Sequence, residues 1–230
     1  MVPYFDRDGI VIYHADCRDV LPSIDPASVD LLLTDPPYGI DLDTAYGARR
    51  PGGVGGRVAN GSRDHVRVAG DDRPFDPSPL LRYGRCVLFG ANHYADRLPP
   101  SGSWVVWDKL DGLRTNKREQ GFNDGADAEL AWTNLSGTVR TFRHMWNGVL
   151  RKSEIGWHVH PTQKPVALMR WIVDRWTEPG DLVLDPYMGS GPVAQACHEL
   201  GRRYIGVELV EDYCAIAVKR LAQQTLALEF

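Results

Sequence analysis

The sequence has few cysteines, no long apolar run and no excess of positive charge. Its four cysteines, Cys17, Cys86, Cys197 and Cys214, form no C-x-x-C pair, so neither a zinc site nor a disulfide framework is predicted. No stretch approaches the ~18 consecutive apolar residues of a membrane helix, and the first residues lack the basic-then-apolar pattern of a secretion signal. We therefore expect a cytoplasmic protein without a membrane segment.

Length and composition are those of one soluble domain. The 230 residues are 43% hydrophobic and 24% charged, which excludes a disordered or fibrous chain and predicts a single domain over residues 1–230. The net charge of −4 argues against a chain that is drawn as a whole to a phosphate backbone. His158 and His160 lie close in sequence but lack a third ligand, so no metal site is predicted.

Hydrophobic periodicity predicts an α/β fold. Helical stripes follow Pro165 and begin again at Val210. Short apolar runs of strand type occupy residues 10–13, 29–33, 86–89, 104–107, 129–132, 182–184 and 204–207. Strands that alternate with helices predict a mostly parallel, twisted sheet with helices on both faces, and residues 104–132 predict an antiparallel hairpin at one edge.

Two stretches do not fit this sheet, at about residues 41–70 and 110–155. Within the first, residues 45–68 are rich in glycine and arginine and cannot build a core. Within the second, residues 110–125 and 135–152 are polar and irregular, with aromatic side chains set among arginines. We expect both stretches to be surface insertions.

The most informative feature is a near-repetition at two strand ends. The first copy, residues 30–39, reads DLLLTDPPYG, and the second, residues 181–189, reads DLVLDPYMG. Ligands bind open parallel sheets beyond the carboxyl ends of the strands, so two such ends side by side would make a site. Asp-Pro also occurs at residues 25–26 and 76–77, where turn chemistry alone explains it.

A glycine turn follows the second strand end. Residues 189–194, GSGPVA, match a G-x-G-x-x-A turn into a helix, and Glu208 lies nineteen residues after Gly189. An acid at about that spacing holds the ribose hydroxyls of a nucleotide-like cofactor. Few residues follow this turn, so the cofactor half of the sheet comes second in sequence and the half carrying Asp35 comes first.

The chemistry of residues 35–38 suits a planar group with an exocyclic amine. Asp35 supplies a carboxylate acceptor, and Pro36 supplies a carbonyl with no competing N–H. Tyr38 supplies a flat face for stacking. Two acceptors can take the two amine hydrogens, and a methyl group held in line behind the nitrogen can then transfer by direct displacement.

At these residues the chain resembles the DNA methyltransferases that use S-adenosylmethionine to methylate exocyclic amines, in the group whose catalytic motif precedes the cofactor motif. The resemblance rests on residues 35–38 (DPPY), residues 185–191 (DPYMGSG) and residues 160–165 (HPTQKP). It extends to residues 15–17 and 206–209 and is weakest in the two insertions. It implies a circularly permuted Rossmann-like methyltransferase fold.

The resemblance also implies a role for each matched residue. Asp35, Pro36, Pro37 and Tyr38 would hold the target base. Asp16 would accept from the cofactor's adenine amine, Glu208 would bind its ribose and Lys164 would face its carboxylate. The implied cofactor-binding residues are Asp16, Cys17, Asp35, Thr162, Lys164, Asp185, Pro186, Tyr187, Gly189, Ser190, Gly191, Glu208 and Leu209. The chain departs from the family at Tyr187, usually Phe, and at Pro192, usually Thr.

Double-stranded DNA is the implied partner, and the positive charge is placed to meet it. Residues 45–68 carry five arginines and one aspartate, and residues 135–152 carry four cations and no acid, so the acidic excess lies elsewhere in the chain. The candidate DNA-binding residues are Arg49, Arg50, Arg57, Arg140, Arg143, Trp146, Arg151 and Lys152. A homodimer and a restriction-modification role are further expectations from the family.

Several alternatives stay open at this stage. The target base is adenine, methylated at N6, or cytosine, methylated at N4, and an aspartate at position 35 favours adenine. A nicotinamide-dependent dehydrogenase would use the same glycine turn, and a DNA-binding relic would have lost the chemistry. Asp16 could instead cap the helix that follows it, and the glycine- and arginine-rich stretch could be a solvated segment alone.

Overall fold

The computed structural model describes residues 1–41, 68–112, 126–135, 137–147, 150–154 and 163–227. The strands are β1 (Phe5–Arg7), β2 (Ile10–His14), β3 (Leu31–Thr34), β4 (Cys86–Phe89), β5 (Trp104–Asp108), β6 (Ala128–Thr133), β7 (Val139–Arg143), β8 (Trp146–Asn147), β9 (Leu150–Arg151), β10 (Leu182–Asp185) and β11 (Arg203–Glu208). The helices are α1 (Cys17–Val20), α2 (Val166–Trp176), α3 (Pro192–Leu200) and α4 (Glu211–Ala227).

Nine of the described strands form one sheet in the order β1-β2-β11-β10-β3-β4-β6-β5-β7. The five central strands, from β2 to β4, run parallel to one another. Strands β5 and β6 pair antiparallel, and β6 is also antiparallel to β4, which confirms the predicted mostly parallel sheet with an antiparallel hairpin. Strand β1 is antiparallel to β2 at the opposite edge.

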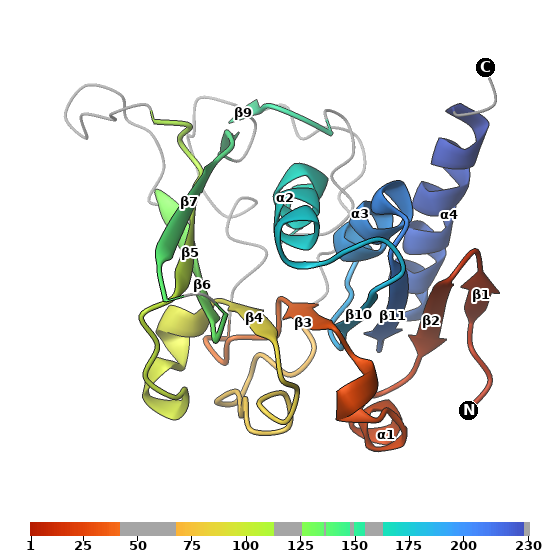
Figure 1. The fold of residues 1–230 in the computed structure, drawn as a ribbon, viewed down its shortest axis with the longest axis horizontal. Helices are drawn as coiled ribbons and strands as arrows, with labels where there is room; N and C mark the ends of the chain where they lie inside the picture. The colour runs from red at the N-terminus through yellow and green to blue at the C-terminus, as the bar shows by residue number, and fades with distance from the viewer. Residues whose placement is uncertain (42–67, 113–125, 136, 148–149, 155–162, 228–230) are drawn as a thin grey trace, which may run out of the picture.

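Alternating side chains divide the core between the two faces of the sheet. Leu31 and Leu33 pack with the apolar side chains of α2, α3 and α4. Leu32 points to the other face and packs with α1 and residues 75–94. Figure 1 shows α2, α3 and α4 on one side of the sheet and α1 on the other. No described helix is long and apolar enough to cross a membrane.

The predicted helix after Pro165 is α2, and its first turn is capped from a distance. Pro165 makes no side-chain cap. The Glu154 carboxylate instead accepts from the Val166 backbone N–H at 2.9 Å, and Gln163 and Arg220 donate to the same carboxylate. An anion at a helix N-terminus satisfies an open donor and complements the helix dipole. Glu154 thus ties α2 and α4 to the segment that carries Lys164.

The expectation of irregular structure over residues 135–152 is wrong at residues 139–143. Strand β7 forms there, pairs parallel with β5 and lies outside the β5–β6 hairpin as the outermost strand. Its residues, VRTFR, alternate between exposed and half-buried side chains. Charged side chains are common on edge strands because they discourage pairing with other chains. In this segment the two arginines made the sequence too polar for a strand to be predicted.

Asp185 is a buried carboxyl at the end of β10. It is 2% exposed, accepts from the Thr34 hydroxyl at 2.6 Å and contacts the Tyr204 hydroxyl at 3.4 Å. Burial raises the pKa of Asp185 to about 7, because desolvation disfavours the charged form more than these hydrogen bonds favour it. The folded chain therefore holds this proton more tightly than the unfolded chain does.

This linkage predicts how stability changes with pH. The contribution of Asp185 is fully present below its ordinary pKa near 4 and is lost as the pH rises through about 7. In Asp185→Asn the amide oxygen still accepts from Thr34 but does not titrate. We expect the free energy of unfolding of the wild type to fall by about 2–3 kcal/mol relative to the variant between pH 5 and pH 8. Urea denaturation at the two pH values measures this, and a pH-independent difference between the two proteins would contradict it.

Candidate active site

The two repeated strand ends meet, as the sequence predicts. Strands β3 and β10 are parallel neighbours, with Leu31 opposite Val183 and Leu32 opposite Leu184. The Thr34 hydroxyl at the end of β3 donates to Asp185 at the end of β10 at 2.6 Å. Asp35, the next residue after Thr34, therefore lies beside the glycine-rich turn that follows β10.

Asp35 and Tyr38 form a direct pair at the end of β3. The Tyr38 hydroxyl donates to Asp35 Oδ1 at 2.6 Å, and the Asp35 side chain is 21% exposed. Pro36 is buried and Pro37 is half-buried. The two prolines limit the backbone between the carboxylate and the ring, so both groups are held at one surface.

The loop after β4 forms a wall against Tyr38. The His93 ring stacks on the Tyr38 ring with centroids 5.1 Å apart and an interplanar angle of 13°. Gly90 has a φ of +66°, and a Cβ atom at this position would overlap the Tyr38 ring. The close approach of the ring therefore requires glycine here. Sequence reasoning missed both residues, because neither belongs to a motif.

Lys164 lies at the centre of a buried charge cluster. Its side chain is 4% exposed, and its Nζ lies 2.5 Å from Asp35 Oδ2 and 3.1 Å from Glu129 Oε2. It also donates to the Tyr38 hydroxyl at 3.2 Å, and Lys109 donates to Glu129 Oε1 at 2.8 Å. The sequence predicts that Lys164 faces the carboxylate of a cofactor. In the structure its ammonium instead pairs with two carboxylates of the protein, Asp35 and Glu129.

The cluster shifts the pKa of Asp35, Glu129 and Lys164. Burial raises the pKa of Asp35 against the opposing attraction of Lys164. Burial alone would raise the pKa of Glu129 as well, but Lys164 and Lys109 together lower it to about 2. Burial disfavours the charged form of Lys164, yet Asp35 and Glu129 raise its pKa well above the ordinary value. The sequence analysis did not predict Glu129 as a site residue. The signal that could have indicated it is an acidic residue within an otherwise apolar strand.

The glycine-rich turn starts α3 and is fastened to β11. Gly189 and Gly191 have φ values of +55° and +77°, which favour glycine. The Glu208 carboxylate accepts from the backbone N–H groups of Gly189 and Val210, each at 2.8 Å. Glu208 at the end of β11 is half-buried, and Leu209 beside it is 53% exposed. The turn and the acid predicted to share a ligand are thus in direct contact.

Asp16 and Cys17 follow β2 and lie beside the end of β11. Asp16 caps α1 by accepting from the Arg18 backbone N–H at 2.9 Å and pairs with the Arg18 guanidinium. Asp16 therefore caps this helix, and its side chain stays 26% exposed. Cys17 is 8% exposed and lies in the core cluster against which Tyr187 packs, and the Ala15 N–H donates to the Glu208 carbonyl at 3.0 Å.

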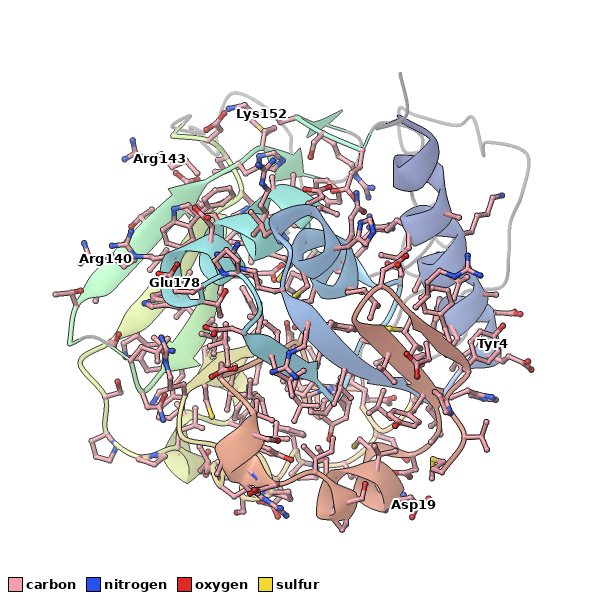
Figure 2. All side chains as sticks on the ribbon, turned by 45° about the vertical axis from the view of Figure 1, so that its right-hand side comes forward. Tyr4, Asp19, Arg140, Arg143, Lys152 and Glu178 are labelled. Atoms are coloured by element: carbon pink, nitrogen blue, oxygen red, sulfur yellow. The ribbon has the colours of Figure 1, made fainter. Side chains whose placement is uncertain are left out.

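The predicted DNA-binding residues that the structure describes lie on and after β7. Figure 2 shows Arg140 and Arg143 projecting from this edge of the sheet, and Lys152 also lies at the surface. Arg143 is 68% exposed and lies 3.7 Å from Asp108, and Lys152 is 57% exposed and pairs with Asp111 at 2.9 Å.

Trp146, a predicted DNA-binding residue, is buried rather than open to a ligand. Trp146 is 6% exposed and packs in the larger core cluster. The Arg151 guanidinium covers its ring at 4.3 Å from the ring centroid. The guanidinium covers one face of the ring, so Arg151 packs against Trp146 in this structure.

Some predicted residues lie outside the described part of the chain. They are Arg49, Arg50, Arg57, His158, His160 and Thr162. Among the residues that are described, no three His, Cys, Asp or Glu side chains are grouped so that they could hold a metal ion.

The chain is similar in sequence to known type II methyltransferases. The chain is 27% identical over 252 residues to the type II methyltransferase M2.LlaDCHI of Lactococcus lactis subsp. cremoris, covering 95% of this chain and 91% of that protein. It is 26% identical over 251 residues to the type II methyltransferase M2.DpnII of Streptococcus pneumoniae, with coverage of 95% and 92%.

The fold agrees with a solved structure as well. The crystal structure of the M1.HpyAVI–SAM complex superimposes with a TM-score of 0.55 at 26% identity, covering 92% of this chain and 98% of that one. The family model for N6/N4 DNA methylases matches residues 91–219, more than half of the chain. The chain is therefore a member of the N6/N4 DNA methylase family.

Proposed function

We propose that the protein transfers the methyl group of S-adenosylmethionine to the N6 amine of an adenine that is flipped out of duplex DNA. One observation carries the proposal. The hydrogen bond between Thr34 and Asp185 joins the ends of β3 and β10, so the Asp35–Tyr38 pair lies next to the glycine-rich turn. An acceptor for an amine and a turn suited to a nucleotide-like cofactor are thereby adjacent.

The Asp35–Tyr38 pair has the chemistry to hold an amine. A carboxylate has about four acceptor positions, so Asp35 can accept from an amine N–H while Tyr38 and Lys164 still donate to it. The flipped base would stack on the aromatic surface that Tyr38 and His93 form. Asp35 would hold the amine nitrogen toward the methyl carbon, so that an N–C bond could form as the S–C bond breaks, and the proton lost by the amine would pass to water.

The donor set around the turn fits S-adenosylmethionine, which supplies an electrophilic methyl group when bound. Gly189 and Gly191 let the backbone approach a ligand closely. Glu208, held by two backbone N–H groups, presents a fixed carboxylate for ribose hydroxyls. Asp16 and Tyr187 would border the adenine end. Asp185, buried beneath the turn, would support it rather than touch the cofactor.

The choice of adenine follows from residue 35. In the resemblance that the motifs carry, aspartate at this position favours adenine over cytosine. The same acceptor chemistry serves the N4 amine of cytosine, so analysis of the product separates the two bases. Strand β7 and the residues after it would contact the phosphate backbone through Arg140, Arg143 and Lys152.

The proposed reaction is tested with labelled S-adenosylmethionine and mixed-sequence duplex DNA. We expect N6-methyladenine on nucleoside analysis, and a loss of about 100-fold or more in Asp35→Asn, because the amide offers fewer acceptors and loses the charge opposite Lys164. Asp76→Asn is the matched control, since Asp76 also precedes a proline but lies in an exposed turn where it accepts from the Ser78 N–H. N4-methylcytosine as the product would show that the target base is cytosine and not adenine. DNA that carries no label would refute the proposed function.

Cofactor binding should depend on Glu208. Glu208→Gln removes the charge and one of two equivalent acceptors at the end of β11, so we expect S-adenosylmethionine to bind about tenfold more weakly. Isothermal titration calorimetry of the protein without DNA measures this, with the exposed Glu178→Gln as the control. Equal affinities in the two variants would exclude Glu208 from the cofactor site.

DNA affinity should depend on the β7 cations. We expect the double variant Arg140→Ala, Arg143→Ala to bind duplex DNA more weakly and to lower the slope of log affinity against log salt by about one for each phosphate that is no longer neutralised. S-adenosylmethionine affinity should stay unchanged. Arg7→Ala removes an exposed arginine from β1 at the opposite edge of the sheet and serves as the control. The same salt slope in the double variant and the wild type would place the DNA elsewhere.

A further inference from the structure

We propose that Glu129 is a positioning residue for methyl transfer, an inference that rests on the proposed function. Through Lys164 it holds Asp35 in place and keeps that carboxylate electron-rich for the target amine. Glu129 lies on β6, outside the sequence motifs that define the site. Its link to Asp35 runs through the Lys164 ammonium, which contacts both carboxylates.

The sheet brings Glu129 to the site from the side opposite β10. Strand β6 is the antiparallel neighbour of β4, with Phe89 opposite Ala131, and the Gly90 N–H donates to the Leu130 carbonyl at 3.0 Å. The chain at Gly90 is also the wall that receives the Tyr38 ring. Glu129 is thus attached by backbone pairing to the same loop that bounds the site.

Lys164 connects the two carboxylates. Its ammonium lies 2.5 Å from Asp35 and 3.1 Å from Glu129, in a position that is 4% exposed. It also lies near the faces of Phe89 and Tyr38, at 5.5 Å and 5.8 Å from the ring centroids. A long lysine side chain with one ionic partner could move with that partner. Two partners, Glu129 on β6 and Asp35 just after β3, fix the ammonium between them.

The charges of the cluster balance. Among the described residues, Asp35 and Glu129 are its acids, Lys164 and Lys109 are its cations, and the Tyr38 hydroxyl contacts Asp35. Asp185 and Tyr94 also interact electrostatically with Asp35. Glu129 Oε2 makes an ion pair with Lys164 but accepts no hydrogen bond from a described residue. The main effect of that oxygen on Asp35 is therefore electrostatic.

Glu129 makes Asp35 a better acceptor. Burial and the negative charge of Glu129 both raise the pKa of Asp35, while Lys164 lowers it. Removing the Glu129 charge would leave Lys164 to act on Asp35 alone, which lowers the pKa of Asp35 and draws its electron density toward the ammonium. A neutral residue of the same shape at position 129 should therefore slow methyl transfer and move the pH at which Asp35 ionises.

The test is the single-turnover rate of methyl transfer from pH 5 to pH 9 in wild type, Glu129→Gln and Glu129→Asp. We expect Glu129→Gln to be about 10- to 100-fold slower, with affinities for S-adenosylmethionine and DNA within twofold of wild type. The acidic limb of its pH profile should move down by about one unit. Glu129→Asp keeps the charge and should keep the limb at the wild-type pH.

The matched control is Glu199→Gln on α3. Glu199 is 22% exposed and pairs with Arg170, and Glu129 is 24% exposed and pairs with Lys164, so both changes remove one half-buried charge from an ion pair. We expect wild-type rates and an unmoved acidic limb in this control. A rate for Glu129→Gln within twofold of an active wild type, or a slow rate with an unmoved limb, would overturn the positioning role.

A second variant guards against loss of folding in Glu129→Gln. Lys109→Met removes the cation on the other side of Glu129 and should move the acidic limb in the opposite direction, to higher pH, because one positive charge leaves the cluster. A shift to lower pH, or none, would count against the proposal. A wild type that methylates no DNA would refute the proposed function itself, a result distinct from any of these.

Discussion

The parallel pairing of β3 with β10 is the constraint on which the site depends. Both strands are buried on both faces, so their register is held by apolar packing above and below the sheet. A slip of one residue would turn Leu31 and Leu33 to the wrong face and separate Thr34 from Asp185. The position of Asp35 beside the glycine-rich turn therefore follows from core packing more than from any contact within the site.

Electrostatics decides the next level of organisation. Burying one lysine with one carboxylate is costly unless other groups complete the pair, and here a second acid and a second lysine do so. The two acids come from β6 and from the end of β3, and Lys164 comes from the segment before α2. The cluster thus couples three parts of the chain that the core alone would leave independent.

Much of the architecture could be predicted because it depends on local patterns. Apolar runs located seven strands of the sheet, and the stripe after Pro165 located α2. Strand β7 was missed because an edge strand buries little, so its alternating arginines read as a polar insertion. The burial of Trp146 was not predicted for a related reason. Its neighbour Arg151 suggested a solvent-exposed segment, but the guanidinium covers the Trp146 ring.

The sequence by itself determined the two strand ends, the chemistry of Asp35 and Tyr38 and the turn at Gly189, because each is a contiguous motif whose function depends on residue type and spacing. Only the tertiary structure decided what surrounds Asp35. Lys164, Glu129 and His93 reach the site from segments far apart in the chain, and no local spacing encodes their distances. A salt bridge or a ring stack across a sheet exists only after the strands have paired, and that pairing is a property of the whole core.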